Sequence, residues 1–339
     1  MAFQDAKAVV RAHHASIGQA DASTIGAALA AHTSADWHWR GMHPFYEQHG
    51  AAAVADSFWQ PFLTAMSSVQ RREDIFFAGE NGPSHAPGVW VVSMGHLMGL
   101  LDKPFLCIPA TRKLTMLRYA EFNRVKDGKI VETAMFFDLI HMMHQAGLRP
   151  LPPQTAQHLI QPGPRTHDGL LNDAQDKAEG QKTLRLIEKM IGDIAANSNS
   201  VENAAPRDAT PQDELRRCWT DDMCWWGPDG IGATFTIDRY IEQHQRPFRT
   251  QNAEREFFGH KARLAEGNYG GFFGWANLSV LPLGGYLGLP AGPRAEMRVV
   301  DIYRREGDKL AENWIFIDIL HFLKQQGLDV IARIEATAG

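Results

Sequence analysis

Two aspartate–histidine pairs recur along this 339-residue chain, and their spacing suits acid–base chemistry. Asp138 is followed three residues later by His141, and Asp318 is followed in the same way by His321. Residues three apart are neighbours on a helix, so each carboxylate could orient the imidazole that follows it. Such a pair, or the carboxylate alone, could act as a general base or a proton shuttle.

Aromatic residues precede both aspartates in segments that predict strands. Alternation along a strand puts Trp314, Phe316 and Asp318 on one face, and it puts Phe136 and Asp138 on the equivalent face. Burial beside aromatic rings raises the pKa of a carboxyl group. A carboxylate of that kind can remove a proton next to a carbonyl group near neutral pH.

A second carboxylate stands on each preceding strand, and these are Glu121 and Asp301. Two carboxylates in one pocket could divide the acid and base roles. Further aromatic and histidine side chains could line pockets for a flat, apolar ligand, although any single one of them could equally be a core residue. In the first half of the chain they are Trp37, Trp39, His43 and His96, and in the second half Trp225, Trp226 and Trp275.

Structural roles compete with these chemical ones. Asp138 and Asp318 stand where a strand gives way to a helix, and aspartate is a favoured N-cap there. His141 and His321 could pack at the rim of a core without taking part in any reaction. A metal site at Asp138, His141 and His144 is not expected, because Lys324 occupies the place of His144 in the second half. We expect no metal and no organic cofactor.

The elements that position these residues form one unit that occurs twice. Residues 128–148 and 308–328 match at a constant offset of 180, and upstream the offset becomes 186. The first copy predicts helices over 5–31, 51–68 and 139–146 and strands over 71–78, 89–101, 113–125 and 129–137. The five prolines of residues 150–169 predict a linker. Another helix is expected between residues 170 and 197.

Composition excludes several classes of function. Lys and Arg total 34 against 39 Asp and Glu, and no segment concentrates the basic residues, so a nucleic-acid partner has no electrostatic support. Three unpaired cysteines indicate a reducing, cytoplasmic location. No run of 18 apolar residues occurs, and residues 1–14 lack the apolar segment of a signal peptide, so we expect no membrane partner.

The order of motifs resembles the SnoaL-like polyketide cyclase family of the nuclear-transport-factor-2-like superfamily. The second half carries it as WWGP, GYLGLPAGPR and VVDIYRREGDKLAENWIFIDILHFLKQQGL, and the first half as CIPATRK, EFNRVKDGKIVE and FFDLIHMMHQAGL. The resemblance implies an α+β fold, with a curved, largely antiparallel sheet wrapped on helices into a cone with an apolar pocket. It also implies an aspartate that acts as general acid and base without a cofactor, matched here to Asp318 and Asp138. Two domains in one chain, and histidines at 141 and 321, depart from the family's usual pattern.

We therefore expect two tandem cone-shaped α+β domains, over 1–149 and 170–339, joined by a linker over 150–169. We expect them to pack on each other as an intramolecular pseudo-dimer, and the chain could also form homo-oligomers. The predicted function is a cyclase- or isomerase-type enzyme acting on a small hydrophobic carbonyl compound. The alternative is a protein that binds a small hydrophobic molecule without chemistry.

Overall fold

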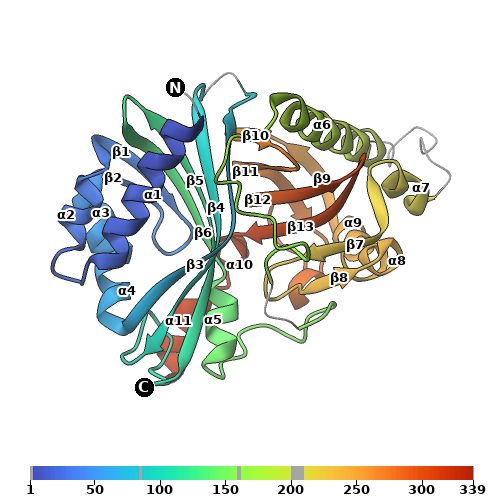
Figure 1. The fold of residues 1–339 in the computed structure, drawn as a ribbon. Coiled ribbons are helices and arrows are strands. Elements are labelled where there is room, and N and C mark those ends of the chain that lie inside the picture. Colours follow the sequence, from blue (N-terminus) through green and yellow to red (C-terminus); the bar gives the residue numbers. More distant parts are fainter. Residues whose placement is uncertain (1–2, 84–85, 159–161, 200–209, 339) are drawn as a thin grey trace. The chain divides into compact units, whose positions relative to one another are not determined.

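The computed structural model describes residues 3–83, 86–158, 162–199 and 210–338 (Figure 1). The chain divides into two compact units. The first contains Met1–Pro150, Arg165–Ala174 and Asp318–Gly339, and the second contains Leu151–Pro164 and Gln175–Ile317. The sequence repeat instead assigns the C-terminal segment to the second copy, and the predicted domain boundaries stay a prediction.

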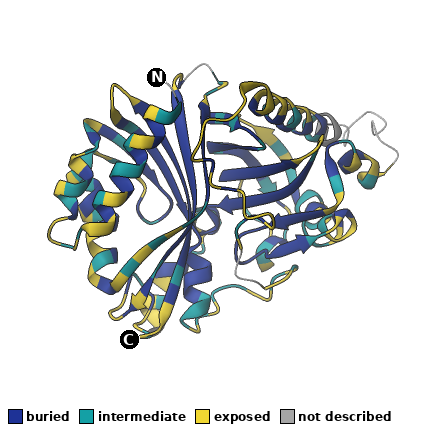
Figure 2. Ribbon diagram, in the orientation of Figure 1, coloured by how far each residue is buried: buried dark blue, intermediate teal, exposed yellow. Residues whose placement is uncertain are grey.

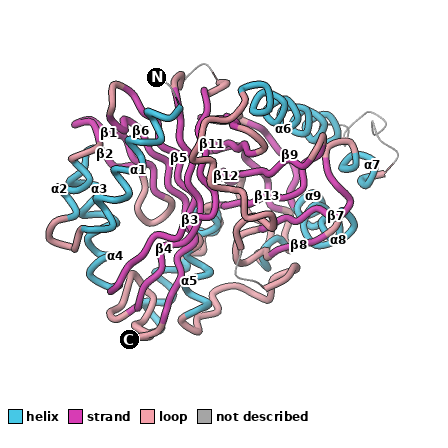
Figure 3. The backbone as a smooth tube through the Cα atoms, in the orientation of Figure 1, coloured by secondary structure: helices cyan, strands magenta, loops and turns pink. Residues whose placement is uncertain are grey.

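The sheet of the first unit has six strands in the order β2-β1-β6-β5-β4-β3 (Figure 3). β1 and β6 are parallel, and the other neighbours are antiparallel. The sheet is therefore mixed, with one parallel pair in an otherwise antiparallel arrangement. Its strands are β1 (Thr33–Gly41), β2 (Glu47–His49), β3 (Met66–Glu80), β4 (Val89–Leu101), β5 (Leu114–Lys126) and β6 (Lys129–Phe137).

Helices of the first unit precede β1, lie between β2 and β3, and follow β6. The helix expected over 5–31 is two helices, because residues 20–24 form a turn in which the Asp21 carboxylate accepts the amides of Ser23 and Thr24. The strand β1 that follows was not expected. The helices are α1 (Phe3–Gln19), α2 (Ile25–Ala30), α3 (Gly50–Val54), the π-helical η1 (Ala55–Trp59), α4 (Gln60–Ala65) and α5 (Leu139–Gln145). The first unit also includes α10 (Ile319–Gln325) and α11 (Val330–Ala338).

The sheet of the second unit repeats this order as β8-β7-β13-β12-β11-β10. β7 and β13 form the parallel pair, as β1 and β6 do. A seventh strand, β9, also pairs with β11, so β9 and β10 together take the place of the single strand β3. The strands are β7 (Trp219–Trp226), β8 (Ala233–Phe235), β9 (Asn252–Phe257), β10 (Ala262–Glu266), β11 (Tyr269–Pro282), β12 (Ala295–Glu306) and β13 (Lys309–Ile317).

A long helix and several short ones pack against the second sheet. α6 begins at residue 177, seven residues after the expected start, and contacts β10, β11 and β13. The others lie before β7, between β8 and β9, and between β11 and β12. The helices are α6 (Lys177–Asn199), α7 (Pro211–Arg216), α8 (Ile237–Tyr240), the π-helical η2 (Ile241–Gln245), α9 (Arg246–Gln251) and the 3-10 turn η3 (Tyr286–Gly288).

The internal repeat is confirmed element by element. Asp138 follows β6 and caps α5, and Asp318 follows β13 and caps α10, at the same offset of 180. Both seven-residue helices end before a glycine with positive φ, Gly147 at 84° and Gly327 at 85°. Such a conformation suits glycine because it has no Cβ.

Burial follows the two sheets. The strands are largely buried, whereas the helices expose one side (Figure 2). Among the described residues, no helix combines the length and the apolar character that a bilayer crossing requires. Each unit therefore has a core between its own sheet and its own helices, and the cavities described next are openings in these cores.

Candidate functional site

The second unit contains a cavity of about 170 Å³ beside β12 and β13. An engineered apolar cavity of about 150 Å³ holds benzene, so this space suits a molecule of one ring. Most of its wall is apolar, and one buried carboxyl group, Asp301, faces it. The apolar part of the wall comes from Ile194, Phe248, Phe257, Leu278, Met297, Val299, Ile315 and Ile317.

Asp301 is 8% exposed and is held by two neighbours. The Asn313 amide donates to its Oδ1 over 3.0 Å, and the Tyr303 hydroxyl is its other hydrogen-bonding partner. Burial raises the pKa of Asp301 to about 7, and these two hydrogen bonds only partly oppose the rise. No residue in the described part of the chain forms an ion pair with it. Asp301 can therefore gain and lose a proton near neutral pH.

The two cationic side chains in the cavity wall are already engaged. Arg249 binds both carboxylate oxygens of Glu214, over 2.7 and 3.1 Å. Arg255 donates to the backbone oxygens of Arg249 and Asn252, over 3.1 and 2.7 Å. These contacts explain why neither guanidinium neutralises Asp301.

A histidine, two tyrosines and Gln245 complete the polar part of the wall. His244 stacks on Trp225 at 4.0 Å, and its buried Nδ1 makes no hydrogen bond to a described residue. Burial, assisted by the charge of Arg249, lowers the pKa of His244 to about 3, so its imidazole is neutral. Burial raises the pKa of Tyr240 and of Tyr286, which leaves both as neutral hydroxyl groups.

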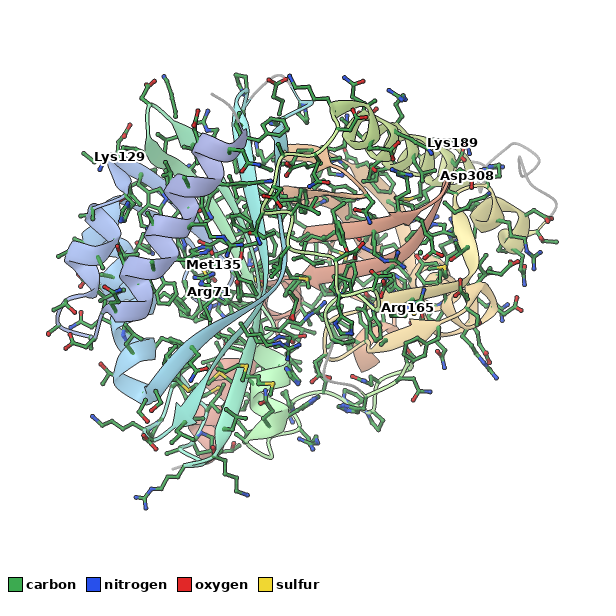
Figure 4. The ribbon with its side chains drawn as sticks, viewed as in Figure 1. Arg71, Lys129, Met135, Arg165, Lys189 and Asp308 are labelled. Carbon is green, nitrogen blue, oxygen red and sulfur yellow. The ribbon has the colours of Figure 1, made fainter. Side chains whose placement is uncertain are left out.

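The first unit has a larger cavity, of about 400 Å³, with different chemistry. Arg71 of β3 and His14 of α1 line it, and Figure 4 labels Arg71 within this unit. Glu121, which is equivalent to Asp301 in the repeat, lies behind them. Its Oε2 accepts from Arg71 over 2.8 Å and from His14 over 3.1 Å.

Glu121 therefore differs sharply from Asp301 in protonation. Burial alone would raise the pKa of Glu121, but the charges of Arg71 and His14 outweigh burial and hold the pKa well below its usual range. Phe257 lines the second cavity at the position that Arg71 takes in the first, since the offset of 186 pairs these two residues. Equivalent carboxyl groups thus become a permanent anion in one unit and a titrating acid in the other.

The aspartate–histidine pairs lie at helix starts. Asp138 Oδ1 accepts the amide of His141 over 3.1 Å, and Asp318 Oδ1 accepts the amide of His321 over 3.2 Å. Asp318 Oδ2 also accepts the amide of His43 over 3.1 Å. Both carboxylates are buried, and neither lines the cavity of about 400 or that of about 170 Å³. The contacts therefore describe N-caps.

The predicted wall of Trp314 and Phe316 occupies the other face of β13 from this cavity. The cavity contacts Ile315 and Ile317, which alternate with them. Both aromatic side chains are fully buried, and the Trp314 indole donates to the backbone oxygen of Pro162 over 2.8 Å. Strand alternation correctly predicted which residues share a face of β13, but it did not indicate which face borders the cavity.

The remaining predicted aromatic residues are dispersed through the two cores. Trp225 reaches the second cavity's wall through His244, while the others have separate partners. In the second unit, Trp226 meets Phe235 edge-on and the Trp275 ring lies under the Arg298 guanidinium. In the first unit, the Trp37 indole donates to the Thr133 hydroxyl, Trp39 stacks on Phe58, and Phe136 is buried. His43 forms a hydrogen bond with the Tyr46 hydroxyl, and His96 Nδ1 lies 3.4 Å from the Asp74 carboxylate.

Sequence reasoning named Asp301 and Glu121 but missed their surroundings. His14 and Arg71 come from α1 and β3, far from Glu121 in the sequence. Tyr240 comes from a helix near β7. The offset of 186 could have indicated part of this difference, because it aligns Arg71 with Phe257 and so shows that the second unit lacks this arginine.

No family model matches the chain, and no curated protein sequence matches it. Solved structures that resemble it include SnoaL-like polyketide cyclases and nuclear-transport-factor-2-like proteins. One of them is a protein from Jannaschia proposed to be a SnoaL-like polyketide cyclase, which is 17% identical in sequence. The match covers 44% of this chain and 94% of the Jannaschia chain, with a TM-score of 0.33.

Two further structures give similar values. A nuclear-transport-factor-2-like protein from Burkholderia thailandensis is 20% identical over 44% of this chain and 100% of its own, with a TM-score of 0.32. IdmH from Streptomyces antibioticus, proposed to be a polyketide cyclase, is 15% identical over 42% of this chain and 98% of its own, with a TM-score of 0.31. Each match spans less than half of this chain.

Proposed function

We propose that the second unit binds a small, largely apolar carbonyl compound and that Asp301 acts on it as general base and acid. The observation that carries this proposal is a buried carboxyl group at a cavity, with a pKa of about 7 and no ion pair to any residue that the structure describes. A general base works best when its pKa lies near the working pH. The reaction class is isomerisation or cyclisation without a cofactor.

The proposed step begins with the carboxylate form of Asp301. It takes a proton from the carbon next to the carbonyl group, the C–H bond breaks, and its electron pair forms an enolate. The same carboxyl group can return the proton to the enolate or to a neighbouring carbon. Tyr240 and Tyr286 line the cavity as neutral donors, and either could stabilise the enolate oxygen.

Catalytic roles for Asp318, Asp138, His321 and His141 stay predictions. In both aspartates the Oδ1 atom accepts a helix amide, that of His141 or His321. Asp301 is preferred as the base because it faces a cavity and titrates near neutrality. The roles of Asp318 and Asp138 would be favoured again if the variant described below kept its activity.

The test uses cyclohex-2-enone, a one-ring ketone, in deuterated water. NMR would follow the exchange of protons next to the carbonyl group for deuterium. We expect the full-length protein to accelerate exchange, with a rate that rises with pH through about 7 as Asp301 ionises. Asp301→Asn should lower the rate about 100-fold or more, whereas Asp308→Asn, at an exposed turn, should leave it unchanged.

The alternative function, binding without chemistry, gives a different result in the same experiment. Line broadening of the ketone signals would then report binding, while the exchange rate would equal that of buffer. An unchanged rate with Asp301→Asn, despite catalysis by the wild-type protein, would refute the role of Asp301.

A further inference from the structure

The first unit's cavity combines apolar walls with a charged floor that the proposed function does not use. The charged groups are Arg11, His14, Arg71, Glu73 and Glu121, joined in one network. We propose that this cavity is a binding site for a small organic monoanion, such as an aromatic or aliphatic carboxylate, and that Arg71 holds the anionic group.

The two carboxylates of the network are satisfied within it. Glu73 accepts from Arg11, from His14 over 3.1 Å and from the Ser93 hydroxyl over 2.9 Å. Glu121 accepts from His14 and Arg71. Neither carboxylate therefore needs a further cation.

His14 adds a positive charge to the network. Its Nδ1 faces Glu73 and its Nε2 faces Glu121, each over 3.1 Å. An ionised carboxylate only accepts hydrogen bonds, so both ring nitrogens must carry protons. The network then contains three cations, Arg11, His14 and Arg71, against two anions. One positive charge remains in excess.

Arg71 has a donor to spare for a ligand. Its side chain is 10% exposed, and its Nη1 binds Glu121. Its Nη2 is buried and makes no hydrogen bond to a described residue. Leaving such a donor unsatisfied is costly, and a carboxylate is the strongest partner that a guanidinium finds. Arg71 lines the cavity, and the rings of Trp59 and Tyr119 pack on its guanidinium, so a ligand meets Nη2 by displacing part of this cover.

The rest of the cavity fits the apolar body of such an anion. Its wall includes Ile17, Trp59, Leu63 and Leu97. The volume, about 400 Å³, exceeds what one ring needs. Asp21 also borders the cavity, but it is exposed, and its carboxylate already accepts the amides of Ser23 and Thr24. Water and these two amides screen the negative charge of Asp21, so its repulsion of a bound anion is small.

The experiment compares 2-naphthoate with its neutral analogue 2-naphthamide on the full-length protein, by isothermal titration calorimetry. We expect the anion to bind at least about 10-fold more tightly, because a hydrogen bond between two charged groups is stronger than one to a neutral amide. Arg71→Met should remove this preference and leave the affinity for naphthamide within about 2-fold.

Arg72→Met is the matched control. Arg72 is the next residue on β3, its side chain is 49% exposed, and it pairs with Asp74 rather than with the network. Its loss should leave both affinities unchanged. Arg71→Met leaves Glu121 with one cation fewer and could impair folding, so the double variant with Glu121→Gln removes both members of the pair. It should show the same loss of preference.

Three results would overturn the proposal. The wild-type protein could bind naphthamide as tightly as naphthoate, it could bind neither at millimolar concentration, or Arg72→Met could lose as much affinity as Arg71→Met. The comparison of the two ligands on the wild-type protein requires no variant, so it stands even if every variant misfolds. Asp301→Asn should not alter naphthoate binding, which separates this proposal from the proposed function.

Discussion

Glu121 and Asp301 stand at equivalent places in β5 and β12, opposite Met135 and Ile315 respectively. Their backbone positions in the sheet are equivalent, and their side chains differ by one methylene group. Only the neighbours distinguish them: Arg71 and His14 surround Glu121, whereas Asn313 and Tyr303 surround Asp301. Charged neighbours keep the first ionised, and neutral ones let burial dominate the second.

This contrast predicts a gain of stability for Asp301→Asn at high pH. The folded-state pKa of about 7 lies above the ordinary value of 3.8, so the folded protein favours the protonated form. The wild-type protein should lose stability as pH rises from about 4 to about 7, and the variant should not. At pH 8 the variant should be more stable by an amount on the order of 3 kcal/mol.

Urea unfolding at pH 4, 6 and 8 measures this difference. The control is Asp308→Asn, which changes an exposed aspartate at the turn between β12 and β13. It should track the wild-type protein at every pH. Parallel pH profiles for the wild-type protein and Asp301→Asn would show that Asp301 is not a titrating group.

The opposite dependence is expected in the first unit. Burial alone would raise the pKa of Glu73, but His14, with Arg11 and Arg71, lowers it from 4.5 to about 2. Its contribution is therefore complete above about pH 4.5 and is lost as pH falls towards 2. Glu73→Gln should cost about 2 kcal/mol at pH 7 and flatten the pH profile below 5. Glu80→Gln, at the exposed end of the same strand, is the control in acid unfolding.

At the scale of elements, the helices α5 and α10 depend on their caps. Each has seven residues, so its unpaired first amides are a large share of its backbone groups. Asp318 serves one helix amide with Oδ1 and the amide of His43 with Oδ2. The two oxygens of the Asp318 carboxylate therefore support α10 and the loop after β1 together.

Two substitutions at Asp318 test the cap. Asp318→Asn keeps one acceptor oxygen and should cost less than about 1 kcal/mol of unfolding free energy. Asp318→Ala removes both acceptors and should cost about 2 kcal/mol. Chemical unfolding of the two variants measures the difference. Equal losses would mean that the charge, rather than the cap, stabilises this position.

The predictability of these elements depended on how local their determinants are. β4 and β6 begin and end at the residues expected from sequence, because both show clear alternation and the Asp127–Gly128 turn fixes the start of β6. β1 was missed because its partner, β6, lies about a hundred residues away and is parallel to it. The sequence also did not indicate which face of β13 borders the second cavity, because helices distant in the sequence decide it.

At the scale of the whole molecule, duplication has given one fold two cavities with different chemistry. The repeat and the α+β class could be predicted from sequence, because a constant offset needs only the chain itself. The chemistry of each cavity could not, because it depends on which side chains α1, β3 and the helices after β8 bring to equivalent carboxyl groups. Glu121 and Asp301 were recognised as carboxylates without their charge states.

The two cavities should accept ligands independently. Every residue that lines the first belongs to the first unit, and every residue that lines the second belongs to the second. The affinity for 2-naphthoate should therefore change by less than about 2-fold when cyclohex-2-enone saturates the protein, which corresponds to a coupling free energy below about 0.4 kcal/mol. Calorimetric titration of naphthoate with and without the ketone measures this coupling. The Arg71→Met variant, which should bind naphthoate no more tightly than naphthamide, must still catalyse exchange of the ketone's protons at the wild-type rate. Simple competition between the two molecules would place them in one cavity and contradict the assignment of separate sites.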